Sequence, residues 1–246
     1  MTGVALITGA ARGIGAACAT HLANQGMAVA LLDVDGAAAQ VRADELRAAG
    51  ANAIAVPCDV TSSSDVDAAV DRVVAELGPL TAAVNSAGIN LARHGVSELG
   101  DDEWAAVLAV NLTGVMFCVR AEVRAMQASG GGSIVNIGSM LSTVAYPNAA
   151  AYVSTKHAVL GLTRSAAIDH AREGIRVNLV APGHVRTDFG HEAMTDEKLQ
   201  ALSERYPRGA IAESDDIAAL VAFLCSDGAR NITGACLASD GGYTAQ

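Results

Sequence analysis

Short apolar runs alternate along the chain with longer segments in which apolar residues recur every three or four positions. The runs have the length and the Val, Ile, Leu and Ala content of buried strands, whereas the segments between them have the periodicity of helices. Strands that alternate with helices pair in parallel through right-handed crossovers. We therefore predict an α/β fold over residues 1–246: a single Rossmann-type domain with a doubly wound, seven-stranded parallel sheet and helices on both faces. The predicted strands are 4–8, 29–33, 53–57, 81–85, 133–138, 175–182 and 234–239.

In a doubly wound sheet, ligands bind at the edge formed by the carboxyl ends of the strands. The longest stretch without clear periodicity, residues 183–199, follows the sixth predicted strand and begins at this edge. Long irregular segments in compact domains are often functional loops. We predict a substrate lid at about residues 184–206.

A glycine-rich turn follows the first predicted strand. Its sequence is TGAARGIG, residues 8–15, with Gly9, Gly13 and Gly15 at the turning points. Glycines let the backbone turn sharply and let a pyrophosphate approach the amides that open the next helix. A strand-to-helix turn that binds nothing has the same pattern. The residue at the end of the second predicted strand therefore decides between a dinucleotide-binding turn and a turn that binds nothing.

Asp33 ends the second predicted strand, at about the distance of 20 residues from the glycines that dinucleotide sites show. A carboxylate at this position accepts hydrogen bonds from both ribose hydroxyls of NAD, and it repels the 2′-phosphate of NADP. Arg12, inside the glycine turn, is the one residue that favours NADP, but Asp33 lies closer to the ribose. We predict NAD as the cofactor.

Composition narrows the classes of partner. The 246 residues are 51% hydrophobic and only 3% aromatic, which suits helices packed tightly on one parallel sheet. The net charge of −10 argues against nucleic acid and anionic membranes as partners. There is no basic leader at the N-terminus and no uninterrupted apolar run of the roughly 20 residues that span a bilayer. The five cysteines show no C-x-x-C pair, so we predict a reducing, cytoplasmic location.

A tyrosine and a lysine, Tyr152 and Lys156, stand four positions apart in AYVSTKH. On a helix, residues with this spacing lie on one face. A free tyrosine ionises at a pH of about 10, and an ammonium group in a partly desolvated cleft is expected to lower that pKa toward neutrality. The pair is thus a candidate general base, although an isolated pair of this kind is more often a surface packing pair.

Six motifs along the chain favour the general base over a surface packing pair. They are TGAARGIG (8–15), NSAG (85–88), NLTG with Asn111, IGSM with Ser139, YVSTK (152–156) and PGHVRTD (182–188). With this order and spacing the chain resembles the short-chain dehydrogenase/reductase family over nearly its whole length. The resemblance implies a Rossmann fold, a nicotinamide cofactor and oxidoreductase activity.

The resemblance also implies four catalytic residues: Asn111, Ser139, Tyr152 and Lys156. Tyr152 takes the hydroxyl proton while hydride leaves the carbinol carbon, and Ser139, after the fifth strand, orients the substrate oxygen. Lys156 also binds the nicotinamide ribose. Asn111 holds a water that leads protons away from the lysine.

The implied cofactor contacts extend along the whole carboxyl edge of the sheet. They include the glycine turn, the residues after the third and fourth strands, and the segment beside the nicotinamide. The full set is Gly9, Arg12, Gly13, Ile14, Gly15, Asp33, Asp59, Val60, Asn85, Ala87, Gly88, Tyr152, Lys156, Pro182, Gly183, Val185 and Thr187. The six histidines show no metal-ligand spacing, so no metal is predicted.

Three segments, 90–97, 140–148 and 184–206, are expected to frame the substrate pocket. They supply mostly apolar side chains and no obvious arginine clamp, which favours a small, neutral, apolar secondary alcohol or ketone. The side chains are Leu91, Met140, Leu141, Val144, Tyr146, Phe189, Met194 and Tyr206, with Arg93 and Arg186 as the only nearby cations and His94, His184 and His191 as loop histidines.

The sequence leaves alternatives open for the activity. A 3-oxoacyl-(acyl-carrier-protein) reductase shares every motif, although Asp33 disfavours NADPH and residues 127–132 carry no basic docking site. A cyclic diol dehydrogenase is a further alternative. A non-catalytic dinucleotide-binding sensor would have lost Tyr152 or Lys156, and both are present. Family members are commonly tetramers, and the apolar faces of segments 102–128 and 151–173 agree with a homotetramer.

Overall fold

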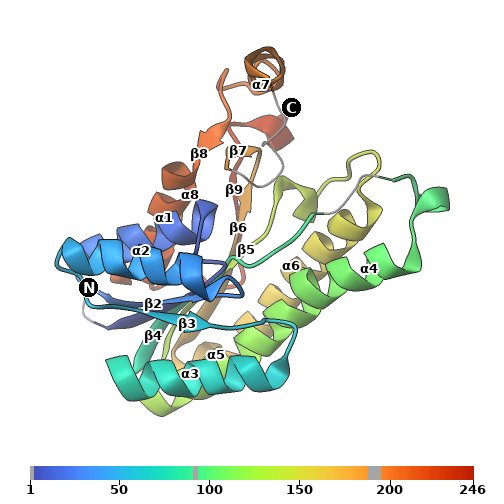
Figure 1. Ribbon diagram of the computed structural model, residues 1–246. Coiled ribbons are helices and arrows are strands. Elements are labelled where there is room, and N and C mark those ends of the chain that lie inside the picture. The colour runs from blue at the N-terminus through green and yellow to red at the C-terminus, as the bar shows by residue number, and fades with distance from the viewer. Residues whose placement is uncertain (1–2, 91–93, 188–194) are drawn as a thin grey trace.

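The protein contains a seven-stranded sheet in which every neighbouring pair is parallel (Figure 1). The computed structural model describes residues 3–90, 94–187 and 195–246. The strand order is β3-β2-β1-β4-β5-β6-β9, so the order reverses between β1 and β4. The predicted fold is confirmed. The strands are β1 (Val4–Thr8), β2 (Ala28–Asp33), β3 (Ala53–Pro57), β4 (Leu80–Asn85), β5 (Gly132–Ile137), β6 (Ile175–Pro182) and β9 (Cys236–Ser239).

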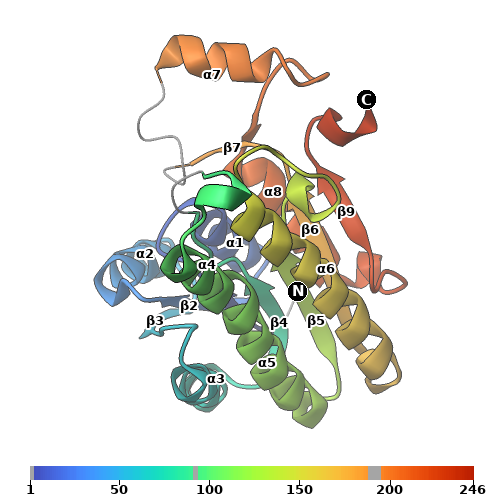
Figure 2. The ribbon, with the colours of Figure 1, turned by 90° about the vertical axis from the view of Figure 1, so that its right-hand side faces the viewer.

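Helices cover both faces of the sheet. The bounds are α1 (Gly13–Asn24), α2 (Gly36–Ala48) and α8 (Ser214–Cys225) on one face, and α3 (Ser63–Leu77), α5 (Val115–Ser129) and α6 (Ala150–His170) on the other (Figure 2). Successive residues of β1 divide between the two cores: Val4 and Leu6 pack under α3, α5 and α6, whereas Ala5 and Ile7 pack under α1, α2 and α8. A strand buried on both faces must be apolar at every position, which is why VALIT shows no polar alternation.

Helix ends follow local chemistry. The Asp35 side chain caps α2 by accepting from the Ala38 amide, and the Ser62 side chain caps α3 by accepting from the Asp65 amide. Helix α5 ends at Gly130, whose φ of +87° is the left-handed conformation that glycine adopts without strain. After these helices the chain enters β3, β4 and β5, respectively.

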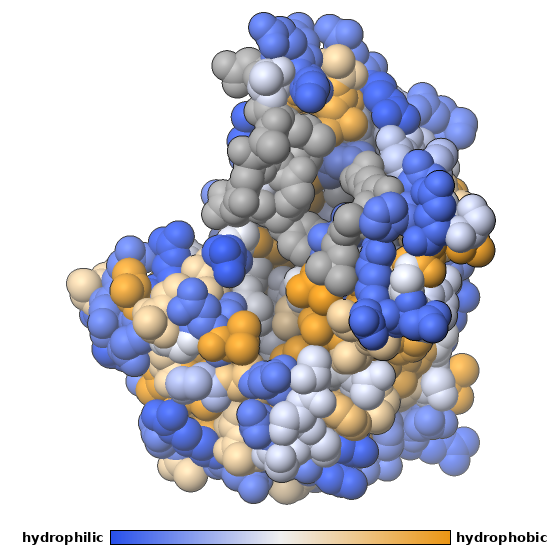
Figure 3. Space-filling view, turned by 45° about the vertical axis from the view of Figure 1, so that its right-hand side comes forward, coloured by the Kyte–Doolittle hydropathy of each residue, from blue (hydrophilic) through white to orange (hydrophobic). Residues whose placement is uncertain are grey.

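Two local features are absent from the sequence prediction. Strands β7 (Val185–Arg186) and β8 (Ala212–Glu213) form a separate two-stranded ladder, and helix α7 (Asp196–Ser203) lies in the segment between them. This segment lies at the carboxyl edge of the main sheet, and the face below it is hollowed (Figure 3). The second feature is a π-helical turn, Ala109–Gly114, between α4 (Asp101–Leu108) and α5.

The stretch Asp101–Ser129 is long and apolar enough to cross a membrane by length and composition alone. Arg120, Glu122 and Arg124 interrupt its apolar run, so the sequence contains no uninterrupted apolar segment there. In the structure its second half, α5, packs on β4 and β5 and supplies Val115, Cys118, Val119 and Met126 to the core. Its buried apolar residues are therefore explained by packing within the protein, whereas Trp104 on α4 is 38% exposed.

Candidate active site

Helix α6 carries Tyr152 and Lys156 on one face, as their spacing predicts. The Lys156 ammonium nitrogen lies 5.4 Å from the centre of the Tyr152 ring. The lysine is buried, with 6% of its surface exposed, and Nζ donates a 2.9 Å hydrogen bond to the carbonyl oxygen of Ile137 at the end of β5. Ile137 was not predicted, because a backbone acceptor has no signature in the sequence.

Ser139 follows β5 by two residues and opens a short 3-10 turn, Met140–Ser142. Its hydroxyl oxygen accepts from the Leu141 amide at 3.1 Å, and its own amide donates to the Ser142 hydroxyl at 3.2 Å. This reciprocal capping fixes the serine backbone. The Ser139 side chain acts to lower the pKa of Tyr152, and Lys156 lies against the Tyr152 ring, so the three residues form one cluster.

The expected pKa shift of the tyrosine is wrong for the protein chain by itself. Burial raises the pKa of Tyr152 to about 12, and the hydrogen bond with Ser139 opposes this rise only in part. Burial also lowers the pKa of Lys156 to about 8. Desolvation disfavours the charged form of each group, and here it outweighs their mutual attraction.

Asn111 lies in the π-helical turn and is fully buried. Its side-chain oxygen accepts from the Ile89 amide at 2.8 Å, and its side-chain nitrogen donates to the Ile89 carbonyl at 2.8 Å. Both side-chain atoms therefore hold the backbone just after Gly88. π-Turns recur at functional sites.

The glycine turn packs tightly against the turn after β4. A Cβ atom on Gly9 would lie 2.8 Å from the Ala87 Cα, and one on Gly15 would lie 2.1 Å from the Gly9 carbonyl oxygen. Gly9 and Gly13 have φ values of +64° and +55°. Glycine is required at these positions, and α1 begins at Gly13 with its first-turn amides at this edge. The arrangement fits a dinucleotide pyrophosphate.

Asp33 joins the end of β2 to the glycine turn. One carboxylate oxygen accepts from the Ala11 amide and the other from the Asp35 amide, both at 3.0 Å. A carboxylate has roughly four acceptor positions, so capacity remains for ribose hydroxyls. Arg12, the first residue outside α1, is exposed.

The remaining predicted cofactor residues lie along the same edge. Asp59 accepts from the amide and the hydroxyl of Thr61 at 2.9 and 2.8 Å, and Val60 packs against Gly114 of the π-helical turn. Near the nicotinamide position, Gly183 lies under the Tyr206 ring and Thr187 lies beside Gly13. Asn85, Pro182 and Val185 are buried, and Ile14 and Gly88 are partly buried.

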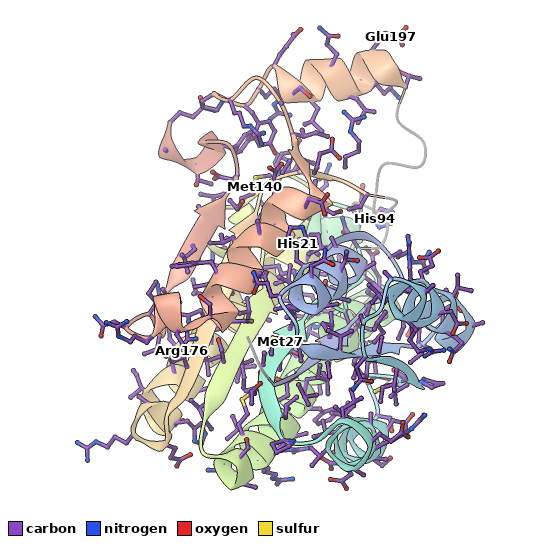
Figure 4. The ribbon with its side chains drawn as sticks, turned by 90° about the vertical axis from the view of Figure 1, so that its left-hand side faces the viewer. His21, Met27, His94, Met140, Arg176 and Glu197 are labelled. Atoms are coloured by element: carbon purple, nitrogen blue, oxygen red, sulfur yellow. The ribbon has the colours of Figure 1, made fainter. Side chains whose placement is uncertain are left out.

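On the substrate side, the Tyr206 hydroxyl contacts residues from two other segments. Its hydroxyl accepts from the His184 amide at 2.9 Å, lies 2.5 Å from His184 Nδ1 and lies 4.0 Å from the Met140 sulfur. Figure 4 shows Met140 between the sheet edge and the segment that carries α7, the helix of Glu197. Tyr206 and Met140 are both buried. They link the predicted lid to the serine turn.

A second group of residues surrounds a small pocket beside Tyr152. His94 Nδ1 lies 2.9 Å from a Glu103 carboxylate oxygen, and Asn148, with a left-handed φ of 57°, lines the same pocket. These residues close the pocket from the α4 side. The predictions for Leu91, Arg93, Phe189, His191 and Met194 lie outside the described residues.

All five cysteines are free thiols. Among residues 3–90, 94–187 and 195–246, no group of three or more His, Cys, Asp or Glu side chains is placed to hold a metal ion. The chemistry available at the described edge is therefore that of a hydroxyl, a phenol, an ammonium group and a carboxylate.

A doubly wound sheet with a glycine turn, an acidic end to β2 and a Ser-Tyr-Lys cluster defines the class of dinucleotide-dependent oxidoreductases. A family model described as enoyl-(acyl carrier protein) reductase matches residues 9–244. Cis-4-hydroxycyclohexanecarboxylate dehydrogenase of Sinomonas cyclohexanicum is 44% identical over 242 residues, which cover 98% of this chain and 96% of the relative. The chain belongs to the short-chain dehydrogenase/reductase family and is an alcohol dehydrogenase/reductase.

Two solved structures agree with the fold and differ in cofactor. A gluconate 5-dehydrogenase from Burkholderia cenocepacia, in complex with NADP and tartrate, has a TM-score of 0.93 at 36% identity and covers 99% of this chain and 95% of its own. Carveol dehydrogenase from Mycobacterium avium, in complex with NAD, has a TM-score of 0.95 at 29% identity and covers 99% of this chain and 98% of its own. These neighbours support a nicotinamide cofactor of either form.

Proposed function

We propose that the protein is an NAD-dependent dehydrogenase that interconverts a ring-bearing secondary alcohol and its ketone, with Tyr152 as the general acid and base. The observation that carries this proposal is the cluster at the end of β5, where Lys156 Nζ lies 5.4 Å from the centre of the Tyr152 ring and donates to the Ile137 carbonyl, and where Ser139 opens the adjoining turn. Ser139 orients the substrate oxygen, and Tyr152 accepts its proton in oxidation. When bound, the oxidised nicotinamide supplies the hydride acceptor and a positive charge beside the phenol.

NAD as the preferred cofactor rests on Asp33. Its carboxylate is held by the Ala11 and Asp35 amides at the point where the adenosine ribose of a Rossmann dinucleotide lies. A 2′-phosphate there would face a fixed negative charge. Two observations favour NADP instead: Arg12 is exposed beside the glycine turn, and the gluconate 5-dehydrogenase neighbour is in complex with NADP.

The proposal of a ring alcohol is supported by two observations. The pocket beside Tyr152 is lined by the apolar Leu99, Val107 and Ala149 to Ala151 and by the polar Asn90, His94, Glu103 and Asn148, so it offers an apolar wall for a ring and hydrogen-bonding groups for its substituents. The relative from Sinomonas cyclohexanicum is named for cis-4-hydroxycyclohexanecarboxylate, a ring alcohol that also carries a carboxylate. We infer the same class of substrate for this chain.

The direct test is a spectrophotometric screen of cyclohexanols, cyclic diols and acyclic alcohols, with NAD and NADP in parallel, on the wild type and Tyr152→Phe. The expected result is turnover of ring alcohols with NAD, and loss of turnover in Tyr152→Phe with NADH binding retained. Turnover that survives in Tyr152→Phe overturns the general base. Exclusive use of acyl-carrier substrates with NADPH would favour the reductase alternative.

We further propose a cytoplasmic homotetramer. Ile168 on α6 is 79% exposed and Trp104 on α4 is 38% exposed, so the outer faces of these helices offer large apolar side chains for burial between subunits. Sedimentation velocity at dilute concentration measures the assembly directly. A monomer at that concentration contradicts the tetramer.

A further inference from the structure

Helix α5 places a carboxyl group, that of Glu122, inside the core between the helix and the sheet. Its exposed fraction is 0% (Figure 2 shows α5 lying across β4 and β5). The side-chain nitrogen of Asn85 donates to Glu122 Oε2 at 3.0 Å. Asn85 ends β4 and begins the turn 85–88, which is the predicted floor of the adenosine ribose site. A carboxyl group with no contact to solvent thus lies directly behind the proposed cofactor site.

Asn85 also begins a chain of buried hydrogen bonds across the sheet. Its nitrogen donates to Asn136 Oδ1 at 3.0 Å, and Asn136 Nδ2 donates to the Thr163 hydroxyl at 2.9 Å. Thr163 donates in turn to the Val159 carbonyl at 2.8 Å. Thr163 belongs to α6, the helix of the tyrosine and lysine. One network therefore connects α5, β4, β5 and α6.

Two oxygen atoms in this network have no hydrogen-bond donor among the described residues: Glu122 Oε1 and Asn85 Oδ1. Both are acceptors when Glu122 is ionised, and both are buried, which is costly for each. A single proton on the carboxyl group supplies the missing donor. The O–H of a neutral Glu122 donates to Asn85 Oδ1 while Asn85 Nδ2 donates to Glu122 Oε2, which gives a closed acid–amide pair.

No opposing charge favours an ionised Glu122 within the part of the chain that the structure describes. On α5 itself Cys118 lies one turn earlier, and beyond it lies Cys58 after β3. Burial raises the pKa of Cys58 to about 11 and that of Cys118 well above its ordinary value, so both thiols are neutral. β4, β5 and α6 contribute the uncharged Asn85, Asn136 and Thr163.

The charged groups between α3 and α5 contact other residues, although Arg120 Nε itself has no hydrogen-bond partner among the described residues. Arg120 donates to the Ser63 hydroxyl at 2.7 Å, and Arg124 pairs with the exposed Asp67 at 4.0 Å. The negative charge of Asp65 contributes to the raised pKa of Cys58. These contacts lie on the α3 side of the helix and leave the Glu122 carboxyl group facing only amides and thiols.

We propose that Glu122 is a positioning residue held as a neutral carboxylic acid, whose proton closes a pair with Asn85 and fixes the 85–88 turn of the cofactor site. Burial raises the pKa of Glu122 to about 8, which agrees with a neutral acid at neutral pH. The expected change in NADH affinity rests on the proposed function. The expected change in thermal stability does not, because it is measured without cofactor and without turnover.

The direction of the pH effect follows from the raised pKa. Between the ordinary glutamate pKa of 4.5 and about 8, the folded protein binds the Glu122 proton and the unfolded chain does not. The contribution of Glu122 to stability is therefore complete below pH 4.5 and is lost as the pH rises to about 8. A glutamine at this position has the same shape, forms both hydrogen bonds and does not ionise.

The experiment compares thermal unfolding of the wild type, Glu122→Gln and Glu122→Leu from pH 5 to pH 9 without cofactor. Glu122→Gln should match the wild type near pH 5 and become more stable relative to it by roughly 5–10 °C near pH 8. Met126→Leu, a volume-conserving change one turn along α5, is the matched control and should follow the wild-type pH profile. Parallel profiles for the wild type and Glu122→Gln would overturn the neutral acid.

Two further readouts separate positioning from folding. Infrared difference spectra of wild type minus Glu122→Gln at pH 6 should contain the C=O stretch of a protonated acid; a carboxylate band alone overturns the proposal. NADH titration followed by fluorescence should give at least a 5-fold weaker affinity for Glu122→Leu and an unchanged affinity for Glu122→Gln. Equal affinity in all three proteins shows that the pair does not position the turn, whether or not the enzyme proposal holds.

Discussion

The Asp33 carboxylate accepts a hydrogen bond from the Ala11 amide at 3.0 Å, so the end of β2 and the glycine turn are joined directly. The other carboxylate oxygen holds the Asp35 amide at 3.0 Å, at the start of α2. The residue proposed to select NAD therefore also shapes the pyrophosphate turn. Substitutions that remove the acceptor change both properties, and a substitution that removes only the charge separates them.

Asp33→Asn comes nearest to this separation. Its amide oxygen still accepts one of the two backbone hydrogen bonds, its amide nitrogen replaces the second acceptor, and the fixed negative charge that opposes a 2′-phosphate is gone. We expect the ratio of kcat/KM for NAD over NADP to fall at least about 10-fold, mainly through improved use of NADP. Steady-state kinetics with both cofactors measure the ratio. Asp71→Asn, an exposed position on α3, is the charge control, and an unchanged ratio in Asp33→Asn would show that Asp33 does not select the cofactor.

Gly15 tests the fit of the glycine turn. A Cβ atom at this position would lie 2.1 Å from the Gly9 carbonyl oxygen, so Gly15→Ala must displace the turn. NADH affinity measured by fluorescence should fall at least about 10-fold. Gly161→Ala on α6 is the matched control: a Cβ there meets nothing within 4 Å, and it should stabilise the helix by about 0.5–1 kcal/mol. Equal affinities would show that the turn does not hold the pyrophosphate.

Most of the fold follows from the apolar pattern, because strands buried on both faces leave continuous runs that no other element explains. The predicted strands 4–8, 53–57 and 175–182 agree with β1, β3 and β6 at both ends. The two-residue strands β7 and β8 could not be predicted, since they form only where the chain on either side of α7 meets in space. The π-helical turn could not be predicted either. Its Asn111 side chain bonds the backbone of Ile89, 22 residues away, and local sequence does not reveal such a contact.

The site shows the same division between local and distant causes. The shared face of Tyr152 and Lys156 follows from helix geometry, and the proximity of Ser139 follows from its place after β5. The pKa of the phenol was predicted in the wrong direction, because desolvation depends on atoms from several elements that a spacing does not reveal. Glu122 was missed although its sequence carries a signal: it lies at helical spacing from Cys118 and Met126 on an otherwise apolar face.

Ser139 is the group that counteracts the desolvation of the phenol. Ser139→Ala removes its hydrogen bond to Tyr152 and should lower kcat/KM about 10²–10³-fold. It should also move the pKa that governs the kcat/KM profile upward, because the lost bond favours the phenolate. Initial rates across pH 6–10.5 measure both effects. Ser139→Thr keeps the hydroxyl and should retain the wild-type pKa; a profile that moves equally in both variants would point to packing as the cause.

Lys156 gives a stability prediction that is independent of turnover. Burial lowers its pKa from 10.5 to about 8, so between these values the folded protein binds fewer protons than the unfolded chain. Stability attributable to this group therefore rises with pH across that window, and it is lost as the pH falls through 8. Lys156→Met removes the titration, and the free energy of unfolding of the wild type relative to the variant should rise by about 3 kcal/mol from pH 7 to pH 10.5. Urea unfolding at these two pH values measures the difference. A constant difference would mean that the pKa of Lys156 is the same in the folded and unfolded states. That result would contradict the lowering of this pKa by burial.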